Sequence, residues 1–391
     1  MDRRALPPER VWTCCVVFKL SHVWQCFMNS VVQCLAHTQP LLDLCLHNSY
    51  QLNSSSPRGG ELMKSFASLL KSIWRDSGGS FSPNAFRSQV ARLAPRFVSY
   101  SQQDGQEFLR YLLLGLHEDI NRVSGRPRGS ISDIPDHLTD TVKAIESWKR
   151  YLRIDDSAIV EDKKQPASCH GGCVADTFVG QLKSSLRCDS CRYDSVTFDP
   201  FWDLSLPIPK LRDSVTLRDC LNLFTKEEIL DGDEKPTCSK CKEKRSCVKS
   251  FSIYKFPKIL VLRILFDLKR FSPYEKYRTK LETTVECPHT LDLGSYTSSS
   301  SQGEMVPSPT AAAANMDRVL AAVYSLFAVA NHTGSTYSGH YTATCRHPVT
   351  GQWHEFNDAR VTKVNSDNVV SSKAYVLFYE LNSPSLQSSR L

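Results

Sequence analysis

The chain has 391 residues, of which 41% are hydrophobic and 23% are charged, and its formal net charge is +7 at pH 7. It is long enough to bury a sizeable core, and no run of about 18 apolar residues occurs, so we expect a globular protein without a membrane-spanning helix. The positive charge is spread along the chain rather than gathered in a basic block with aromatic residues, which argues against nucleic acid binding.

The cysteine content bears on the cellular compartment. The chain contains 15 cysteines, and its first residues include Pro7 and Pro8 but lack the continuous apolar segment of a secretory signal. In a reducing compartment, cysteines bind metals or catalyse reactions rather than form disulfides. We therefore expect a cytoplasmic protein that can also enter the nucleus. Residues 1–20 show no usable pattern and are an unassigned leader.

The first predicted helix carries a cysteine at its start. Apolar residues recur at helical spacing at Met28, Val31, Val32 and Leu35, which puts Cys26 at or just before the first turn. The unpaired N–H groups and the positive dipole end of a helix N-terminus favour a thiolate there, so Cys26 is a candidate nucleophile. The alternative is a small buried cysteine at a helix start, which is the commoner role of this residue type.

Further helices are predicted up to Leu152. A helical pattern covers Leu62 to Trp74, and Pro83 can open the next helix after a break rich in Gly and Ser. The segment from Glu107 to Val123 has one apolar stripe, formed by Leu109, Leu112, Leu113, Leu116 and Ile120. The first half of the chain therefore reads as a mostly helical lobe that carries the candidate nucleophile.

Residues 161–174 read as an inserted loop with the run Cys169-His170-Gly171-Gly172-Cys173. A metal site in this loop is one interpretation, because cysteine and histidine are both metal ligands. A surface insertion with free thiols is the favoured interpretation, since the run offers only three ligands and no fourth is obvious nearby.

From Phe178 onward, short β-branched and aromatic runs predict strands. Two CxxC motifs lie between these runs, and each can form a knuckle that holds two thiolates about 2.3 Å from a metal ion. Two knuckles complete a tetrahedral site, so we predict one structural zinc ion held by Cys188, Cys191, Cys238 and Cys241. Cys247 follows too far along the chain to belong to the second knuckle, and we expect it to be a spare thiol.

Strands resume after residue 322, and one of them carries a candidate general base. His340 follows a glycine, and Asn357 and Asp358 follow one hairpin later. A cysteine, a distant histidine and then an asparagine or aspartate is the order found in papain-like cysteine proteases. Strand alternation does not decide between Asn357 and Asp358 as the residue that orients the imidazole. A lone histidine is more often structural, and we assign His332 and His354 to structure.

Three sequence boxes follow one another along the chain: CFMNSVVQCL from Cys26, YSQQDGQEF from Tyr100, and SGHYTA from Ser338 with FNDARV and AYVLFYEL behind it. Together they resemble the ubiquitin-specific protease family, from about residue 25 to residue 381. The resemblance implies an α+β, papain-like cysteine protease fold with a helical thumb, a β palm and zinc-ribbon β fingers. It also implies a catalytic domain over residues 21–382, with insertions near 161–174 and 298–322 and a tail at 383–391.

The resemblance implies a deubiquitinating thiol protease, which hydrolyses the isopeptide bond at the C-terminal glycine of ubiquitin. Cys26 would be the nucleophile and His340 the base. The resemblance favours Asn357 as the orienting residue, with Asp358 in support.

The resemblance also implies a substrate channel. In the family, the Gln-Gln-Asp box lines the channel for the basic tail of ubiquitin, so Gln103 and Asp104 are predicted to bind substrate. An aspartate that complements the dipole of a helix N-terminus is compatible with the same position. The expected partners are ubiquitin and ubiquitinated proteins, and we expect a monomer.

Three segments depart from the family pattern. The family has an asparagine that donates to the oxyanion hole where this chain has Ser21, and a glycine where it has Val23. Extra residues near Arg263 to Asp267 would shift the register of a central strand unless they bulge out. Residues 298–322 are rich in Ser, Pro and Ala, and we expect them to be disordered. The alternative function is therefore a catalytically weakened or dead ubiquitin-binding pseudoenzyme.

Overall fold

The computed structural model describes residues 26–75, 83–98, 103–121, 134–154, 174–209, 214–265, 284–297, 322–334, 339–358 and 360–382. Several of the sequence predictions lie outside these residues. The segment through Gln25 is one of them, and it includes the leader, Ser21 and Val23. The others are the run from Cys169 to Cys173, the tail, and all of the insertion at 298–322 except its last residue.

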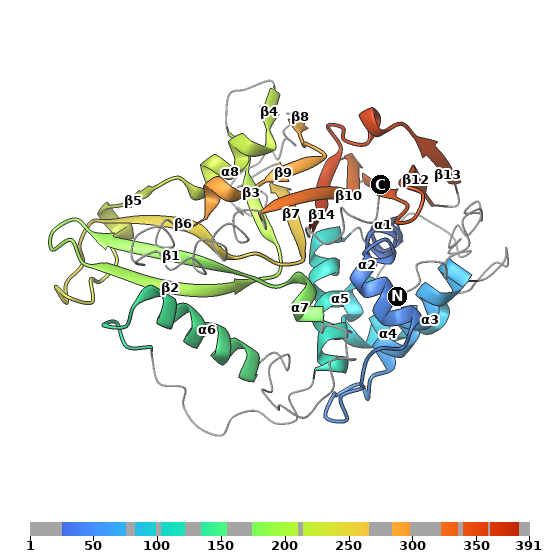
Figure 1. Ribbon diagram of the computed structural model, residues 1–391, viewed down its shortest axis with the longest axis horizontal. Helices are drawn as coiled ribbons and strands as arrows, with labels where there is room; N and C mark the ends of the chain where they lie inside the picture. The colour runs from blue at the N-terminus through green and yellow to red at the C-terminus, as the bar shows by residue number, and fades with distance from the viewer. Residues whose placement is uncertain are drawn as a thin grey trace, which may run out of the picture.

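The first part of the described chain is helical, as predicted. Figure 1 shows α1 to α5 gathered on one side of the molecule and α6 lying along strand β2. None of the helices in the described ranges combines the length and the apolar character that crossing a membrane requires. The α-helices are α1 (Cys26–Ala36), α2 (Gln39–Leu46), α3 (Glu61–Arg75), α4 (Asn84–Leu93), α5 (Gly105–Ile120), α6 (Asp140–Ile154), α7 (Val174–Phe178) and α8 (Leu217–Thr225).

The rest of the described chain is mostly strands, arranged in three sheets. A four-stranded sheet has the order β2-β1-β6-β5, an eight-stranded sheet has the order β13-β12-β11-β10-β14-β7-β3 with β9 paired to β10, and β4 pairs with β8. The strands are β1 (Gly180–Cys188), β2 (Asp194–Phe201), β3 (Leu204–Pro207), β4 (Ser214–Thr216), β5 (Glu228–Leu230), β6 (Cys247–Lys255), β7 (Ile259–Leu265), β8 (Thr284–Glu286), β9 (Thr290–Asp292), β10 (Val323–Gly334), β11 (Gly339–Arg346), β12 (Trp353–Asn357), β13 (Arg360–Val364) and β14 (Ala374–Leu381).

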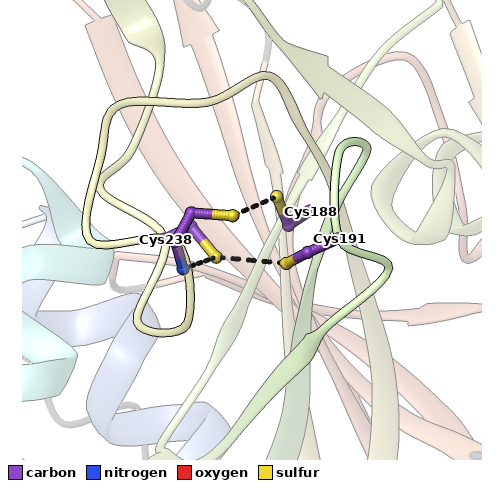
Figure 2. A group of neighbouring side chains, drawn as sticks. Cys188, Cys191 and Cys238 are labelled. Carbon is purple, nitrogen blue, oxygen red and sulfur yellow. Dashed lines mark hydrogen bonds between the residues drawn. The ribbon is translucent and has the colours of Figure 1, made fainter.

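The four-stranded sheet extends away from the helical lobe, and we call it the fingers sheet (Figure 1). Its central strands are antiparallel, and their pairing ends with Cys188 opposite Cys247. The cysteines of the two CxxC motifs meet at this end of the sheet (Figure 2). The two motifs are about 50 residues apart along the chain, so the pairing of β1 with β6 is what brings them together.

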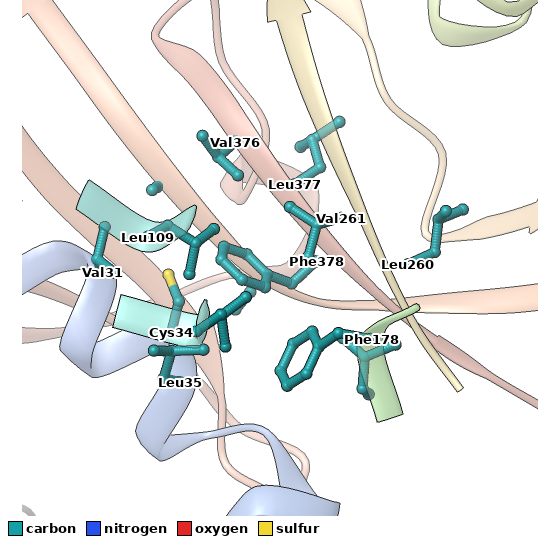
Figure 3. Close-up of a cluster of buried hydrophobic side chains, with 14 of the residues drawn as sticks. Val31, Cys34, Leu35, Leu109, Phe178, Leu260, Val261, Val376, Leu377 and Phe378 are labelled. Carbon is teal, nitrogen blue, oxygen red and sulfur yellow. The ribbon is translucent and has the colours of Figure 1, made fainter. Parts of the chain in front are cut away.

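The eight-stranded sheet, which we call the palm sheet, packs against the helical lobe through α1. Figure 3 shows Val31 and Leu35 of α1 facing side chains of β7 and β14, which include Val261 and Phe378. All of these side chains are at most 1% exposed. The apolar stripe that predicted the first helix therefore forms part of the interface between the two lobes.

Local sequence accounts for where two other helices begin. α5 begins after Asp104, whose carboxylate accepts from the N–H groups of Gln106 and Glu107, as an N-cap does. α8 was missed by the sequence analysis, although Thr216 and Asp219 form a capping box at its start. The box is a sequence signal for a helix N-terminus that could have been found.

The predicted disturbance of the central strand does not occur within the described part of β7. Arg263 pairs with Val376 of β14 and Ser205 of β3, and the same register runs from Ile259 onward without a bulge. The pairing with β3 continues to Leu265, beyond which the next described residue is Thr284. The prediction for Phe266 and Asp267 therefore lies outside the described residues.

Candidate active site

Cys26 is the first residue of α1, so its predicted position at a helix start is confirmed. Its side chain is 3% exposed. Phe27 anchors this end of the helix, because its ring packs edge-on against Phe108 of α5 at a centroid distance of 5.4 Å. α1 also packs along β11, the strand that carries His340.

The groups around the Cys26 sulfur shift its pKa in opposite directions. Burial raises the pKa of the thiol and the Asp358 carboxylate raises it further, whereas backbone N–H groups of Tyr341, Phe27 and Cys26 itself lower it. The net shift is upward, which differs from the thiolate expected from the helix dipole. Burial outweighs the N–H groups at this site, so the resting group is a thiol whose proton needs an acceptor.

His340 on β11 is the candidate acceptor. Its Nε2 lies 2.8 Å from Oδ1 of Asn357, the last residue of β12. Since the amide oxygen only accepts hydrogen bonds, Nε2 carries the proton and Nδ1 is the basic nitrogen of the ring. Tyr341, the next residue, gives its backbone N–H to Cys26, so the histidine and the cysteine lie on adjoining elements.

The structure distinguishes the positions of Asn357 and Asp358. Asn357 is within hydrogen-bond distance of His340, whereas Asp358 Oδ2 is 3.9 Å from Nε2. Asp358 has a φ of 48°, in the left-handed region, and turns the chain at the end of β12. Asp358 Oδ1 accepts a hydrogen bond from Nδ2 of Asn29 on α1 at 3.3 Å.

A glycine is required directly before His340. A Cβ atom on Gly339 would lie 2.4 Å from Nε2 of His332 and 2.7 Å from the carbonyl oxygen of Thr333. The His332 ring is buried and packs on Tyr341 at a centroid distance of 4.5 Å. The structural role assigned to His332 fits this packing, because the ring supports the strand that carries His340.

Asp104 is held by several groups of the protein. Its carboxylate accepts from Tyr375 Oη at 2.8 Å and from Arg263 Nη2 at 2.9 Å, in addition to the helix N-cap contacts. Arg263 also donates to Gln106 Oε1 at 2.8 Å. Gln103 precedes this cluster and is half-buried. A cation of a substrate would therefore compete with Arg263 for Asp104.

A cavity of about 420 Å³ opens beside this cluster, between α5 and the strands of the fingers and palm sheets. Asp203 faces it and accepts from Gln106 Nε2 at 2.7 Å. Burial raises the pKa of the Asp203 carboxyl, against the lowering effect of Arg110 and Gln106. The residues that line the cavity are Gln106, Glu107, Arg110, Tyr111, Leu182, Phe201, Asp203, Leu204, Ser205, Phe224 and Arg263.

The four cysteines predicted as metal ligands lie together at the end of the fingers sheet (Figure 2). Their sulfur atoms are all within 4.8 Å of one another, with Cys188 to Cys241 at 4.0 Å and Cys191 to Cys238 at 3.6 Å. A tetrahedral site with bonds of about 2.3 Å requires sulfur–sulfur distances of about 3.8 Å. The arrangement therefore fits one tetrahedral metal ion.

The two knuckles have the same backbone geometry. Arg192 and Lys242, which follow the second cysteine of each motif, have φ values of 57° and 60°. The backbone N–H groups of each turn point at sulfur, and those of Cys191 and Ser190 lower the pKa of Cys188 to about 6. Such groups stabilise the thiolate form that binds a metal. Cys247 packs beside the cluster but is not one of the four cysteines whose sulfur atoms lie together.

Three residues near the candidate site were missed by the sequence analysis. Asn29 lies three residues after Cys26, and the helical period puts both on one face of α1, so its contact with Asp358 had a local signal. Tyr341 accepts from the Gly105 N–H at 3.2 Å, and Arg263 joins Asp104 from a distant strand. These last two contacts have no local signal, because the partners are far apart in the sequence.

Comparisons with known proteins agree with this geometry. Residues 22–379 match the profile of a family described as ubiquitin carboxyl-terminal hydrolase. The chain is 48% identical over 364 residues to ubiquitin carboxyl-terminal hydrolase 2 of Rattus norvegicus, covering 92% of this chain and 53% of that protein. It is 51% identical over 327 residues to the protein of the same name from Gallus gallus, covering 83% and 81%. The chain thus spans about half the length of the mammalian relatives that it matches.

Solved structures have the same fold. One is the SAGA Ubp8/Sgf11/Sus1/Sgf73 DUB module bound to ubiquitin aldehyde, with a TM-score of 0.62, 24% identity, and coverage of 95% of this chain and 71% of that chain. A second is the same module with a single-residue variant of Ubp8, bound to monoubiquitin, with a TM-score of 0.62, 23% identity, and coverage of 96% and 72%. The likeness extends over both lobes and confirms the predicted fold.

Proposed function

The chain belongs to the ubiquitin carboxyl-terminal hydrolase family, and from this premise we propose that it is a cysteine-dependent deubiquitinating protease. The substrate is ubiquitin joined through its C-terminal glycine to an amine of another protein. The observation that carries the proposal is the hydrogen bond of 2.8 Å between His340 and Asn357, on a strand that packs against the helix starting at Cys26. A nucleophile, a base and an orienting residue are the three groups that a thiol protease needs.

The reaction begins with proton transfer from the Cys26 thiol to Nδ1 of His340. The sulfur then attacks the carbonyl carbon of the ubiquitin glycine, and a carbon–sulfur bond forms as the carbonyl oxygen becomes an oxyanion. The imidazolium returns its proton to the nitrogen of the leaving amine, and the carbon–nitrogen bond breaks. Water, deprotonated by His340, hydrolyses the thioester and regenerates the thiol.

The other groups of the site stabilise these steps. Asn357 holds the ring so that Nε2 keeps its proton and Nδ1 faces the reaction. The upward shift of the Cys26 pKa makes this base necessary, because the resting thiol does not ionise by itself. The backbone N–H groups at the start of α1 are suited to receive the oxyanion.

We propose that the basic tail of ubiquitin binds along the start of α5, where Gln103 and Asp104 lie. The cavity of about 420 Å³ beside Asp104 offers room for a side chain, and Asp203 supplies a second carboxylate there. Arg263 already pairs with Asp104, so the tail must either displace Arg263 from Asp104 or bind to Asp203. We further propose that the enzyme acts as a monomer on ubiquitinated proteins.

We propose that the four-cysteine cluster binds zinc. Zinc is the ion that thiolate sets of this kind hold in structural sites, and the sulfur spacing fits its tetrahedral geometry. When bound, it would link the turn between β1 and β2 to the segment before β6. Its role is structural, because all four positions are taken by protein ligands and none is left for a substrate.

The alternative of a dead ubiquitin-binding module is not favoured, because Cys26, His340 and Asn357 are all present and lie on adjoining elements. Turnover of ubiquitin bearing a fluorogenic C-terminal amide separates the two functions. The proposal predicts turnover that Cys26→Ala abolishes while ubiquitin binding persists. Binding without any turnover by the unmodified chain would support the dead module.

A further inference from the structure

Asn29 connects the nucleophile helix to the turn behind the base. It lies one helical turn after Cys26, and its Nδ2 donates to Oδ1 of Asp358 at 3.3 Å. Asp358 directly follows Asn357, the residue that orients His340. This contact therefore joins α1 of the helical lobe to the end of β12 in the palm sheet.

The hydrogen bond fixes which way the Asp358 carboxylate points. Oδ1 is engaged by Asn29, while Oδ2 lies 3.9 Å from Nε2 of His340. The backbone φ of 48° at Asp358 lies in the left-handed region, which residues other than glycine adopt infrequently, and a contact from outside the turn stabilises it. Asn29 supplies such a contact across the gap between the two elements.

The orientation of the Asn29 amide is also determined. A carboxylate only accepts hydrogen bonds, so the nitrogen and not the oxygen must face Asp358. Within the described part of the chain, Asn29 Oδ1 is buried without a hydrogen-bond partner, and Gln33 Oε1 is too. Both residues line a cavity of about 10 Å³ that Asp358 closes on the other side. The protein therefore tolerates an unpaired oxygen in order to keep the nitrogen on the carboxylate.

We propose that Asn29 is a positioning residue of the active site, which holds the Asp358 carboxylate at a fixed distance from His340. This inference rests on the proposed function. Among the described residues, the titratable groups near Asp358 are His340 and Tyr341 from β11 and Cys26 from α1. A carboxylate held there disfavours the Cys26 thiolate, and its other oxygen lies beside the His340 ring, so its position bears on the proton transfer between the two residues.

The test uses Asn29→Ala and the nearly isosteric Asn29→Leu, with Gln33→Ala as the matched control. Gln33 lines the same small cavity, and its Oε1 has no hydrogen-bond partner among the described residues. We expect both Asn29 variants to lower kcat for a ubiquitin C-terminal amide about 10-fold with little change in KM, since the misplaced Asp358 carboxylate acts on Cys26 and His340 and not on ubiquitin binding. The limb of the pH profile that reports the Cys26 thiol should move to lower pH, because the Asp358 carboxylate raises the pKa of that thiol and moves away in these variants. The control should leave this limb unchanged.

A double-mutant cycle and a thiol-labelling assay complete the test. In an Asp358→Asn background, Asn29→Leu should cause no further loss, because the two residues act as one unit. The rate of iodoacetamide alkylation of Cys26, followed by peptide mass spectrometry across pH, should shift in the Asn29 variants even without a ubiquitin substrate. If the Asn29 variants show this shift relative to a wild-type chain that does not cleave ubiquitin, the proposed function is refuted and the positioning role stands. Unshifted profiles in both assays, or losses that add to those of Asp358→Asn, would overturn the inference.

Discussion

Arg263 of β7 donates to the Asp104 carboxylate at 2.9 Å, although the two residues are 159 positions apart in the sequence. Their side chains are only 14% and 20% exposed. The contact joins the start of α5 to the palm sheet, and Tyr375 of β14 adds a hydrogen bond to the same carboxylate. It also neutralises the acid that the sequence analysis predicted to receive the basic tail of ubiquitin.

The first prediction concerns this ion pair. Arg263→Gln should lower KM for a ubiquitin C-terminal amide about 3- to 10-fold, because it removes a competing cation from Asp104. The carboxylate should remain in place, since two backbone N–H groups and Tyr375 still hold it. Arg96→Gln is the control, because Arg96 pairs with Glu107 at 2.9 Å and is not among the residues that line the cavity. A KM that rises in Arg263→Gln would mean that the arginine helps to bind the substrate.

The second prediction concerns the metal. Cys238→Ser should reduce the zinc content from one ion per chain to near zero, as measured by metal analysis of the purified protein. Hydrogen exchange should then increase in β1, β2 and β6 before it increases in α1 to α5, because the ion ties only the end of the fingers sheet. Cys247→Ser is the matched control, since Cys247 is buried beside the cluster but is not a ligand. Unchanged zinc content in Cys238→Ser would refute the four-cysteine site.

The third prediction concerns stability in acid. His37 is buried against Trp74 and Phe356, and burial lowers its pKa from 6.5 to about 4. Below pH 6.5 the unfolded chain takes up this proton before the folded chain, so the stability from neutral His37 is lost as the pH falls from 6.5 toward 4. By pH 5 the loss is about 2 kcal/mol, at about 1.4 kcal/mol per pH unit.

Urea unfolding at pH 7, 6 and 5 measures this loss. In His37→Gln the decrease in unfolding free energy between pH 7 and pH 5 should be smaller than in the wild type by about 2 kcal/mol. His47→Gln should behave like the wild type, because His47 is exposed at the end of α2. An identical decrease in His37→Gln and the wild type would exclude His37 as its source.

The sequence predicted those features that depend on local patterns. The apolar stripe at Met28 to Leu35 predicted α1, and the spacing within each CxxC motif predicted the two knuckles. The order of the three boxes predicted the family and the fold, and both are confirmed.

Features that depend on tertiary geometry could not be predicted. Strand alternation could not choose between Asn357 and Asp358, which the structure separates by their distances from His340, and only the family resemblance favoured Asn357. The ion pair of Asp104 and Arg263 depends on where β7 lies relative to α5. The direction of the Cys26 pKa shift depends on burial, which outweighs the helix N-terminus that the sequence did predict.

The fourth prediction concerns the segment before Cys26, which lies outside the described residues. Restoring the family pattern with Ser21→Asn, Val23→Gly, Trp24→Asn and Gln25→Thr should raise turnover of a ubiquitin C-terminal amide about 100-fold or more, because an oxyanion donor is regained. Ubiquitin affinity should change little, since the fingers sheet and Asp104 are unaltered. Turnover rates and ubiquitin affinities of both versions should be measured side by side. A restored segment that binds ubiquitin equally well but gains no rate would locate the defect elsewhere.

The central claim is that Cys26 is the nucleophile of a deubiquitinating protease. Its most direct test is the reaction of the full chain with ubiquitin carrying a C-terminal electrophile, followed by peptide mass spectrometry of the modified residue. We predict one covalent adduct per chain, located on Cys26, that is lost in Cys26→Ser and strongly reduced in His340→Ala. An adduct on another cysteine, or one that persists in Cys26→Ser, would contradict the claim.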